Sequence, residues 1–431
     1  MQLFGTSGIR RVADDNLIQL ALKIGLSVGK AYDSVVVGSD TRASSDAIKH
    51  VLISGLLAAG GKSCDAGLVP TPTLALAARD FDAGAMITAS HNPPQYNGVK
   101  LLNPDGSAFD SAQQKRIEES VFGDPFLAAR WDESKSSSIH NGAVKHHIER
   151  VLSGFPDRLE LKVAVDCGCG AASVITPDLL SKMGCEVIAL NCKPSGSFPH
   201  DIEPTEASLG ELIGATKELG ADLGIAHDGD GDRMMVVDDT GRFVPGDKLL
   251  VIFAREVGAK EVVTTIDASM AIDEMGFKVT RTRVGDTHVS EELKKGGDFG
   301  GEPSGSWVFP DISLCPDGIY AAAQVVTIAS RQKLSSLVDD IPGYPILRGS
   351  VTGEVVMYNL EQRLMAMEPL AVSKVDGIKL SFENGWLLVR KSGTESKIRI
   401  TAEAKSEAQV HQLYDKGIRA VKDSMEISEG E

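Results

Sequence analysis

The sequence predicts an α/β protein of three related mixed α/β domains followed by a smaller C-terminal α+β domain. The chain has 431 residues, which at roughly 150 residues per domain allows three domains or four small ones. Three segments, beginning at Val35, Lys162 and Glu261, each combine a β-branched run, a polar or glycine-rich turn, an apolar-periodic helix and a second strand. Strands that alternate with helices in this way predict βαβ units with mostly parallel sheets. After residue 349 the pattern becomes strand, loop, strand over 386–404 and then helix, which predicts the α+β domain.

Polar stretches punctuated by proline and glycine mark the joints between these domains. They lie at 131–142, 238–248 and 339–349. We therefore expect domains at 1–140, 141–243, 244–345 and 346–431. Because the last joint has few large apolar side chains, the fourth domain is expected to hinge rather than to form a broad rigid interface.

Composition and charge are those of an ordinary globular protein. Hydrophobic residues make up 42% and charged residues 24%, which argues against disordered and fibrous classes. The formal net charge of −16 argues against a nucleic-acid partner, which would select a basic face or tail. The absence of an apolar run of roughly 18 residues and of an apolar signal segment predicts no membrane partner and a cytoplasmic location. The six cysteines form no CxxC pair, which favours reduced core thiols over disulfides or zinc ligands.

The first loop that could carry chemistry follows the apolar strand that ends near residue 89. Pro93 and Pro94 remove two backbone donors and stiffen this loop, which holds the Ser90 hydroxyl in place. A serine is a weak nucleophile unless a base or a cation stands beside it, and His91 and Lys100 are the nearby candidates. The alternative is a serine that merely caps a turn or a helix.

The second loop, within 223–239, carries three aspartates at alternate positions between two apolar strands. In an extended segment Asp228, Asp230 and Asp232 would fall on one side, where their charges repel unless a hard cation sits among them. Oxygen ligands alone favour magnesium or calcium over zinc, and Arg233 in place of a required glycine excludes an EF-hand. We predict a Mg²⁺ site here, with a solvated acidic turn as the alternative.

Two further loops give weaker signals. In 298–310, glycines surround Glu302 and Ser304, an acceptor and a donor suited to ligand hydroxyls, although a tight glycine turn explains them equally well. In 387–400, Arg390 and other basic residues surround a short run of Ser, Gly and Thr, a combination that suits a phosphate monoester. A solvated hairpin edge is the alternative for this second loop.

Two other readings of the sequence are disfavoured. The segment 168–173 begins like a dinucleotide-binding fingerprint but lacks the third glycine. The acidic loop could belong to a phosphatase with an aspartate nucleophile, but Asp230 is followed by Gly231 and Asp232 rather than by the Thr or Val of that motif.

Taken together, the four loops predict one site in a central cleft: a positioned serine, a divalent cation, a hydroxyl-binding pair and a phosphate cradle. The four loops carry, in chain order, the motifs TASHNP with NGVK, DGDGDR, GEPSG and RKSGTES. The sequence resembles the α-D-phosphohexomutases, which have these motifs in the same order, over essentially its whole length. The resemblance implies a heart-shaped chain of four domains around a central cleft, a fourth domain that can swing over the cleft, and Mg²⁺ as cofactor.

The resemblance also implies how such a site works. A phosphoryl group on Ser90 would pass to a hexose monophosphate, and the bisphosphorylated sugar would turn round and return its opposite phosphate. The implied catalytic residues are Ser90, Lys100, Arg10 and His91. The implied metal ligands are Ser90, Asp228, Asp230 and Asp232. The implied substrate-binding residues are Arg233, Glu302, Ser304, Arg390, Ser392, Gly393 and Thr394. Lys100 and Arg10 would transfer protons or stabilise charge, and His91 would support Ser90.

The sugar preference is inferred from two loops. GEPSG followed by Ser306 and Trp307, together with VGDTHV at 284–289, resembles the archaeal phosphoglucosamine mutases, and Ser306 stands where many relatives have histidine. This resemblance implies interconversion of glucosamine 6-phosphate and glucosamine 1-phosphate.

A mannose- or glucose-phosphate mutase of broad specificity is the alternative activity, and a non-catalytic sugar-binding protein is an alternative of another class. The expected partners are hexose or hexosamine phosphates, and the expected assembly is a monomer or a homodimer.

Overall fold

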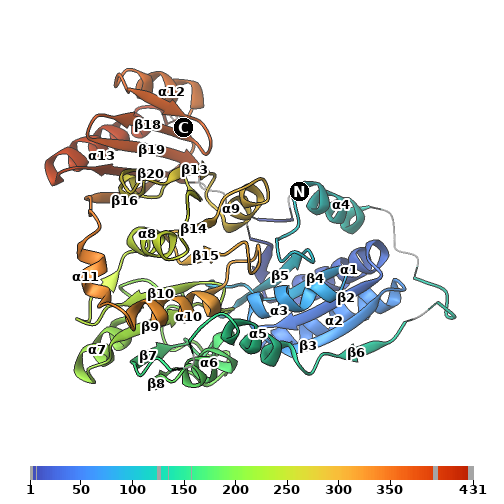
Figure 1. Cartoon of the computed structure of the whole chain (residues 1–431). Helices are drawn as coiled ribbons and strands as arrows, with labels where there is room; N and C mark the ends of the chain where they lie inside the picture. The colour runs from blue at the N-terminus through green and yellow to red at the C-terminus, as the bar shows by residue number, and fades with distance from the viewer. Residues whose placement is uncertain are drawn as a thin grey trace.

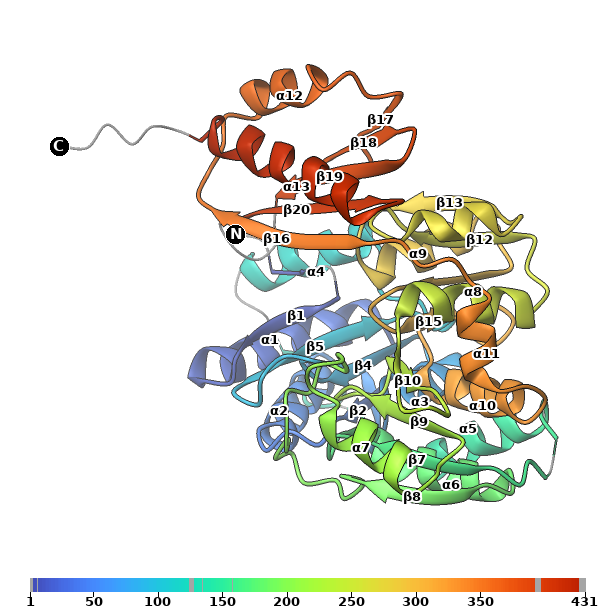
Figure 2. The same cartoon turned by 90° about the vertical axis from the view of Figure 1, so that its left-hand side faces the viewer.

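The computed structural model describes residues 3–5, 7–123, 128–133, 135–156, 158–391 and 397–425. Their strands form four sheets, one for each successive part of the chain (Figure 1). Figures 1 and 2 agree that the part built from β16 to α13 lies at one end of the molecule, next to the part built from β12 to β15. The expected fold class, three mixed α/β domains and a smaller α+β domain, is confirmed.

The first domain is a six-stranded sheet in the order β1-β5-β4-β2-β3-β6. Its elements are β1 (Ile9–Val12), α1 (Asp15–Ala31), β2 (Ser34–Ser39), α2 (Ser45–Ala58), β3 (Lys62–Leu68), α3 (Thr71–Ala77), β4 (Ala83–Ile87), β5 (Tyr96–Leu102), α4 (Ser111–Phe122) and β6 (Ser137–Ile139). Side chains of β2 alternate between the two faces: Val35 and Val37 join the core under α1 and α2, and Val36 joins the core with α3. Helices therefore cover both faces, which explains why the strand is apolar at successive positions.

The second domain is a five-stranded sheet in the order β11-β10-β9-β7-β8. Its elements are α5 (Ala143–Leu152), β7 (Lys162–Asp166), α6 (Thr176–Lys182), β8 (Glu186–Leu190), α7 (Gly210–Glu218), β9 (Leu223–His227), β10 (Met234–Val237) and β11 (Phe243–Val244). β7 pairs in parallel with β8 and β9, as the sequence pattern predicts. β11 spans the expected boundary between residues 243 and 244.

The third domain is a four-stranded sheet in the order β13-β12-β14-β15. Its elements are α8 (Gly246–Glu256), β12 (Glu261–Thr265), η3 (Met270–Glu274), β13 (Lys278–Thr282), α9 (Asp286–Leu293), β14 (Phe299–Glu302), β15 (Ser306–Val308), α10 (Gly318–Ala329) and α11 (Leu334–Asp339). The apolar-periodic helix expected between the two strands of this segment is only the 3₁₀ turn η3. The connection, residues 266–277, is at the lower limit of roughly a dozen residues for a parallel crossover, and η3 is its helical part.

The fourth domain is an antiparallel sheet in the order β16-β20-β19-β18-β17. Its elements are β16 (Ile346–Thr352), α12 (Met357–Met365), β17 (Ala371–Ser373), β18 (Ile378–Phe382), β19 (Gly385–Lys391), β20 (Lys397–Ala404) and α13 (Glu407–Lys422). The strands predicted within 386–404 and the helix predicted after them are β19, β20 and α13.

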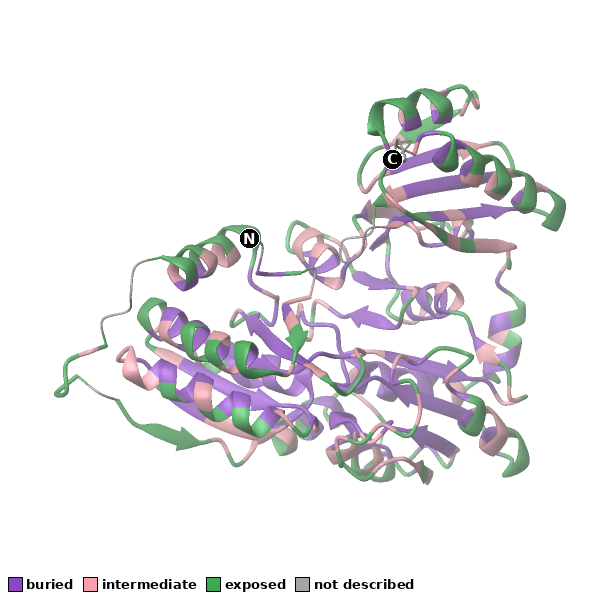
Figure 3. Cartoon of the chain, turned by 180° about the vertical axis from the view of Figure 1, so that it is seen from behind, coloured by how far each residue is buried: buried purple, intermediate pink, exposed green. Residues whose placement is uncertain are grey.

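The burial pattern shows how the domains are joined. In Figure 3 the strands are mostly buried, and the exposed residues gather on outward helix faces and on peripheral elements such as β6. One apolar cluster runs through the second and third domains, with Phe253, Phe299 and Trp307 at its aromatic centre, so these two domains share a core. No helix in the described part of the chain combines the length and apolar character that crossing a membrane requires.

All three α/β domains place a loop of interest at the same point of the fold. In each domain one strand of the parallel part of the sheet turns back into an antiparallel neighbour: β4 into β5, β9 into β10 and β14 into β15. These turns carry Ser90, the three aspartates and Ser304, respectively. The common position explains how loops far apart in sequence can serve one site.

Candidate active site

Ser90 lies in the turn between β4 and β5 and is almost completely buried. Its Oγ donates a hydrogen bond to Asp228 Oδ2 at 2.8 Å and lies 3.2 Å from His91 Nδ1. The Ser90 backbone has a φ of +51°, a left-handed conformation that is uncommon outside glycine. Its amide donates to Thr88 Oγ1 at 2.8 Å. The hydroxyl is therefore aimed at the acidic loop of the second domain.

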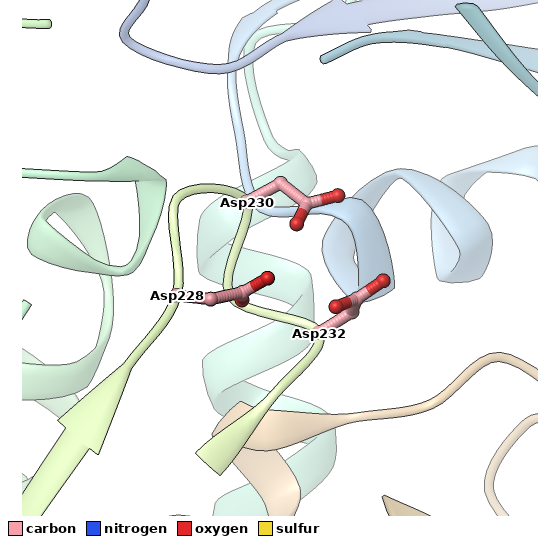
Figure 4. Close-up of side chains that lie close together, drawn as sticks. All are labelled: Asp228, Asp230 and Asp232. Atoms are coloured by element: carbon pink, nitrogen blue, oxygen red, sulfur yellow. The ribbon is translucent and has the colours of Figure 1, made fainter. Parts of the chain in front are cut away.

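That acidic loop turns from β9 to β10 and carries three buried carboxylates, as Figure 4 shows. Asp228, Asp230 and Asp232 each offer one oxygen, and these oxygens all lie within 4.8 Å of one another. Asp228 Oδ1 accepts hydrogen bonds from the amides of Gly231 and Arg233, which fix the turn. The three side chains gather as the sequence predicts, but they do so around a turn and not along the extended segment expected from the sequence.

Lys100, on β5, partly balances this negative charge. Its Nζ lies 2.7 Å from Asp230 Oδ2 and 2.5 Å from Asp232 Oδ2. Burial opposes the charge on Lys100, but the two aspartates outweigh burial and raise its pKa. Burial, reinforced by the charges of Asp232 and Asp230, raises the pKa of Asp228 well above its usual range. Lys100 is therefore ion-paired with Asp230 and Asp232, whereas Asp228 lies outside these two ion pairs.

The donor set fits a hard divalent cation. All the candidate ligands are oxygens, which magnesium and calcium prefer. Asp230 Oδ1 is buried and has no hydrogen-bond partner, although buried carboxylate oxygens are normally paired. Ser90 Oγ, hydrogen-bonded to Asp228, borders the same cluster. A bound cation would satisfy the unpaired oxygen and offset the repulsion among the carboxylates.

Arg10 and His91 lie beside the Ser90 loop. Arg10, on β1, donates from Nη1 to Asn92 Oδ1 at 2.8 Å, and its buried Nε has no hydrogen-bond partner. Burial lowers the pKa of His91 to about 2, and the charges of Arg233, Arg10 and Lys100 act in the same direction. The His91 ring is therefore a neutral imidazole.

The sugar-binding candidates line a cavity of about 350 Å³ among the second, third and fourth domains. Glu302 ends β14 and is buried, and its Oε1 accepts from the Gly285 amide at 2.8 Å. Ser304 is exposed in the next turn and lines the same cavity. Arg233 reaches Glu203, another cavity residue, with an Nη1–Oε1 distance of 2.9 Å. These contacts bring Arg233, Glu302 and Ser304 to one region.

The phosphate-binding candidates are described only in part. Arg390, at the end of β19, lies 3.5 Å from Asp376 Oδ2 through its Nη1. Ser392, Gly393 and Thr394 lie outside the described residues. Ser306, which stands where many relatives have histidine, is buried on β15 and forms a backbone bridge with Arg233.

Sequence reasoning missed two residues that contact the site, Thr71 and Arg42. Thr71 donates from Oγ1 to Asp230 Oδ2. Thr71 follows the end of β3, and the carboxyl ends of parallel strands share one edge of the sheet, which could have indicated it. Arg42, in the turn before α2, donates to the Ser90 carbonyl, and its sequence context gave no signal of this contact.

Comparisons with known proteins match all four domains of the chain to one family. Models of the phosphoglucomutase/phosphomannomutase α/β/α domains I, II and III match residues 1–127, 143–241 and 245–344, and the model of the C-terminal domain matches 355–419. A probable phosphoglucosamine mutase of Methanococcoides burtonii is 48% identical, with 95% of this chain and 96% of the relative covered. A phosphoglucosamine mutase of Methanococcus maripaludis is 42% identical, with coverage of 98% and 99%.

Solved structures support the same assignment. A phosphoglucomutase/phosphomannomutase family protein of Burkholderia thailandensis superposes with a TM-score of 0.86 at 28% identity, covering 98% of this chain and 97% of that one. An N-acetylphosphoglucosamine mutase of Aspergillus fumigatus, solved with GlcNAc-6P and magnesium, shares the fold with a TM-score of 0.64 at 15% identity, covering 98% and 96%. With four consecutive domains matched and close relatives spanning nearly its full length, the chain belongs to the phosphoglucomutase/phosphomannomutase family of α-D-phosphohexomutases.

Proposed function

We propose that this chain is a phosphoglucosamine mutase that interconverts glucosamine 6-phosphate and glucosamine 1-phosphate through a phosphorylated Ser90 and a bisphosphorylated sugar. The observation that carries the proposal is the hydrogen bond from buried Ser90 Oγ to Asp228, within a cluster of three carboxylates and beside Lys100. Relatives of 40–48% identity that carry the name phosphoglucosamine mutase support the choice of substrate.

The proposed metal is Mg²⁺, held by Ser90, Asp228, Asp230 and Asp232. When bound, it would neutralise charge on the phosphoryl oxygens during transfer. The oxygen-only donor set and the unpaired Asp230 Oδ1 support this assignment.

The remaining residues have complementary roles in the proposed transfer. As the bond from phosphorus to Ser90 Oγ breaks, a bond forms from phosphorus to O1 or O6 of the sugar, and the sugar hydroxyl loses its proton. Lys100, kept as an ammonium by its carboxylate partners, is suited to stabilise charge. The proton of the sugar hydroxyl is taken up overall by Ser90 Oγ, the oxygen released from phosphorus. Neutral His91, 3.2 Å from that oxygen, would orient it rather than act as the base, because its lowered pKa makes it a poor proton acceptor. Arg10 adds positive charge next to the loop.

The same carboxylate-rich cavity supports an amino sugar as substrate. Its acidic lining residues are Glu203, Glu206, Asp247, Asp267 and Glu302, of which Glu302 is largely protonated at neutral pH because its pKa is raised to about 8. Among the described residues that line it, Arg348 is the basic one. At neutral pH the C2 ammonium of glucosamine is favoured in such a field over the neutral C2 hydroxyl of glucose or mannose. Glu302 and Ser304 would bind sugar hydroxyls, and Arg390, Ser392, Gly393 and Thr394 would bind the phosphate that is not reacting.

Mass spectrometry of the intact protein after incubation with glucose 1,6-bisphosphate tests this proposal. We expect one added phosphate that maps to Ser90 and is absent in Ser90→Ala, with most turnover lost in that variant. Turnover of glucosamine 6-phosphate, glucose 6-phosphate and mannose 6-phosphate should be measured in parallel. Phosphate on Asp228 or Asp230 would overturn the role of Ser90, and faster turnover of mannose or glucose 6-phosphate would favour the broad-specificity alternative.

A further inference from the structure

Arg42 lies in the turn between β2 and α2 and has no exposed side-chain surface. Its Nε pairs with Asp40 Oδ2 at 3.0 Å. Each of the four remaining N–H groups of the guanidinium is directed at a backbone carbonyl of the Ser90 loop. Nη1 donates to the carbonyls of Pro93 and Tyr96 at 2.7 and 2.9 Å, and Nη2 donates to those of Ser90 and Asn92 at 2.7 Å each. One side chain therefore fixes the loop at four points.

Asp40 connects the same guanidinium to the other side of Ser90. Besides Arg42, Asp40 Oδ2 accepts from Thr88 Oγ1 at 2.7 Å. The Thr88 hydroxyl in turn accepts from the Ser90 amide at 2.8 Å. Ser45 Oγ donates to Asp40 Oδ1 at 2.7 Å and holds the carboxylate from behind. The amide of Ser90 is thus held through Thr88 and its carbonyl through Arg42.

The conformation of Ser90 explains why such support is needed. A non-glycine residue in the left-handed region is disfavoured, and it persists only where its surroundings impose it. The carbonyls of the loop also need hydrogen-bond donors, because an unpaired buried carbonyl destabilises a fold. Arg42 removes both problems, since its hydrogen bonds satisfy the carbonyls and hold the backbone at φ +51°.

The second domain encloses this arrangement. The ring of Phe198 lies over the guanidinium, with its centroid 5.1 Å from Arg42 Cζ. At Gly229, between the first two aspartates, a Cβ atom would lie 2.6 Å from the Ser90 carbonyl oxygen, so the acidic loop rests directly on the Ser90 loop. A shift of the Ser90 backbone would therefore move Oγ relative to Asp228.

We propose that Arg42 is a positioning residue for phosphoryl transfer: through the carbonyls of the Ser90 loop it fixes the direction of Ser90 Oγ toward the acidic cluster. Arg42 acts through the loop and contacts neither the sugar nor the phosphate. This inference rests on the proposed function of Ser90. It assigns to Arg42 an effect on the rate of transfer rather than on the binding of the sugar phosphate.

Arg42→Lys is the main test, because lysine keeps the charge beside Asp40 but cannot reproduce the planar fork. We expect kcat to fall about 100-fold with KM changed less than about threefold, since a misplacement of 1 Å can reduce a rate by that factor. Phosphorylation of Ser90 by glucose 1,6-bisphosphate, followed by intact-protein mass, should slow by a similar factor. Arg116→Lys, on the exposed side of α4, is the matched control and should behave as the wild type.

Rescue separates positioning from a general loss of structure. Added guanidinium ion should restore part of kcat in Arg42→Ala and should not change the control. If that variant does not fold, Thr88→Val keeps Arg42 while removing the link from Asp40 to the Ser90 amide, and it should lower kcat with KM nearly unchanged. Wild-type kcat and phosphorylation rates in folded Arg42→Lys, or wild-type kcat in Thr88→Val, would overturn the inference. A wild-type protein that never acquires phosphate on Ser90 would refute the proposed function itself.

Discussion

Around Ser90, buried side chains of opposite charge lie close together, and burial disfavours their ionised forms. Three carboxylates with almost no exposed surface lie together, and Lys100 is bonded to two of them. Burial disfavours ionisation, and neighbouring carboxylates add to that effect. The raised pKa of Asp228 follows from both causes, burial first. A divalent cation is the simplest partner that lets all three remain ionised at neutral pH.

We predict that chelation abolishes turnover and that Mg²⁺ restores it. Asp230→Asn should lower kcat by several orders of magnitude, because the variant loses both a proposed cation ligand and an ion-pair partner of Lys100. Circular dichroism should show a largely intact fold. Asp178→Asn, an exposed aspartate of the same domain, is the control and should leave kcat unchanged. Full activity in metal-free protein would contradict the assignment of the loop.

Glu302 gives a prediction about pH and stability. Burial, reinforced by the charge of Asp286, raises the pKa of Glu302 to about 8 from an ordinary value of 4.5. The folded chain then retains a proton that the unfolded chain releases, so this carboxyl makes the fold less stable as pH rises from about 4.5 to about 8. Glu302→Gln does not titrate and should therefore gain stability relative to the wild type between pH 5 and pH 8.5.

Urea unfolding at the two pH values measures this gain. Glu218→Gln, an exposed glutamate on α7, serves as the control and should show no such dependence. A stability difference between Glu302→Gln and the wild type that stays the same at both pH values would mean that Glu302 is ionised throughout.

At the scale of elements, α10 stabilises the protein through its N-terminal cap as well as through its packing, because the cap links all three α/β domains. Asp317 is buried, and its Oδ1 accepts from the Ile319 and Tyr320 amides at the start of the helix. Its Oδ2 lies 3.2 Å from His147 Nε2 on α5, although the geometry is not that of a hydrogen bond. His147 Nδ1 lies 2.8 Å from Thr73 Oγ1 on α3. The cap thus connects the third domain to the second and the first.

Asp317→Ala should therefore destabilise the protein by more than an ordinary cap does, which is about 1 kcal/mol. We expect a loss of about 2 kcal/mol or more, because the change also leaves buried His147 without its carboxylate neighbour. Asp110→Ala, at the exposed capping box of α4, is the matched control for a cap alone. Equal losses of unfolding free energy in the two variants, measured in urea, would rule out the additional role of Asp317.

At the scale of the whole molecule, the fourth domain is joined to the third by specific contacts. Trp386 and Leu388 pack against Ile266. Buried Lys379 donates from Nζ to the Ile266 carbonyl at 2.6 Å, and Glu403 accepts from the Met270 amide at 2.7 Å. The hinge at 339–349 stays a prediction, and any motion of the fourth domain must preserve or exchange these contacts.

Arg390→Ala tests the role of the fourth domain. If Arg390 binds the phosphate that is not reacting, its loss should raise KM, lower kcat and release more bisphosphorylated sugar into solution. Kinetics together with chromatographic measurement of free bisphosphate check all three effects. Arg363→Ala, an exposed arginine on α12, is the control. Unchanged kinetics and no additional free bisphosphate would indicate that Arg390 belongs only to a solvated hairpin edge.

The sequence by itself determined the fold class and the main loops, because both depend on local patterns. Alternating strands and helices indicated parallel sheets, and the short motifs around Ser90 and Asp230 indicated a serine and a metal site. The apolar pattern was less informative in the short connection between β12 and β13, because it does not distinguish an α-helix from a single 3₁₀ turn. The helix expected there is the 3₁₀ turn η3.

Only the tertiary structure decided which residues form ion pairs or hydrogen bonds with one another. Lys100 and Asp230 are 130 positions apart, and no local pattern relates them; they meet because β4 and β9 each turn back at a domain junction. Arg42 stands 48 positions before Ser90 in what the sequence shows as an ordinary turn before a helix. Its role follows from four carbonyls that converge on one buried guanidinium, and the direction of backbone carbonyls is set by the folded path of the chain rather than by residue type.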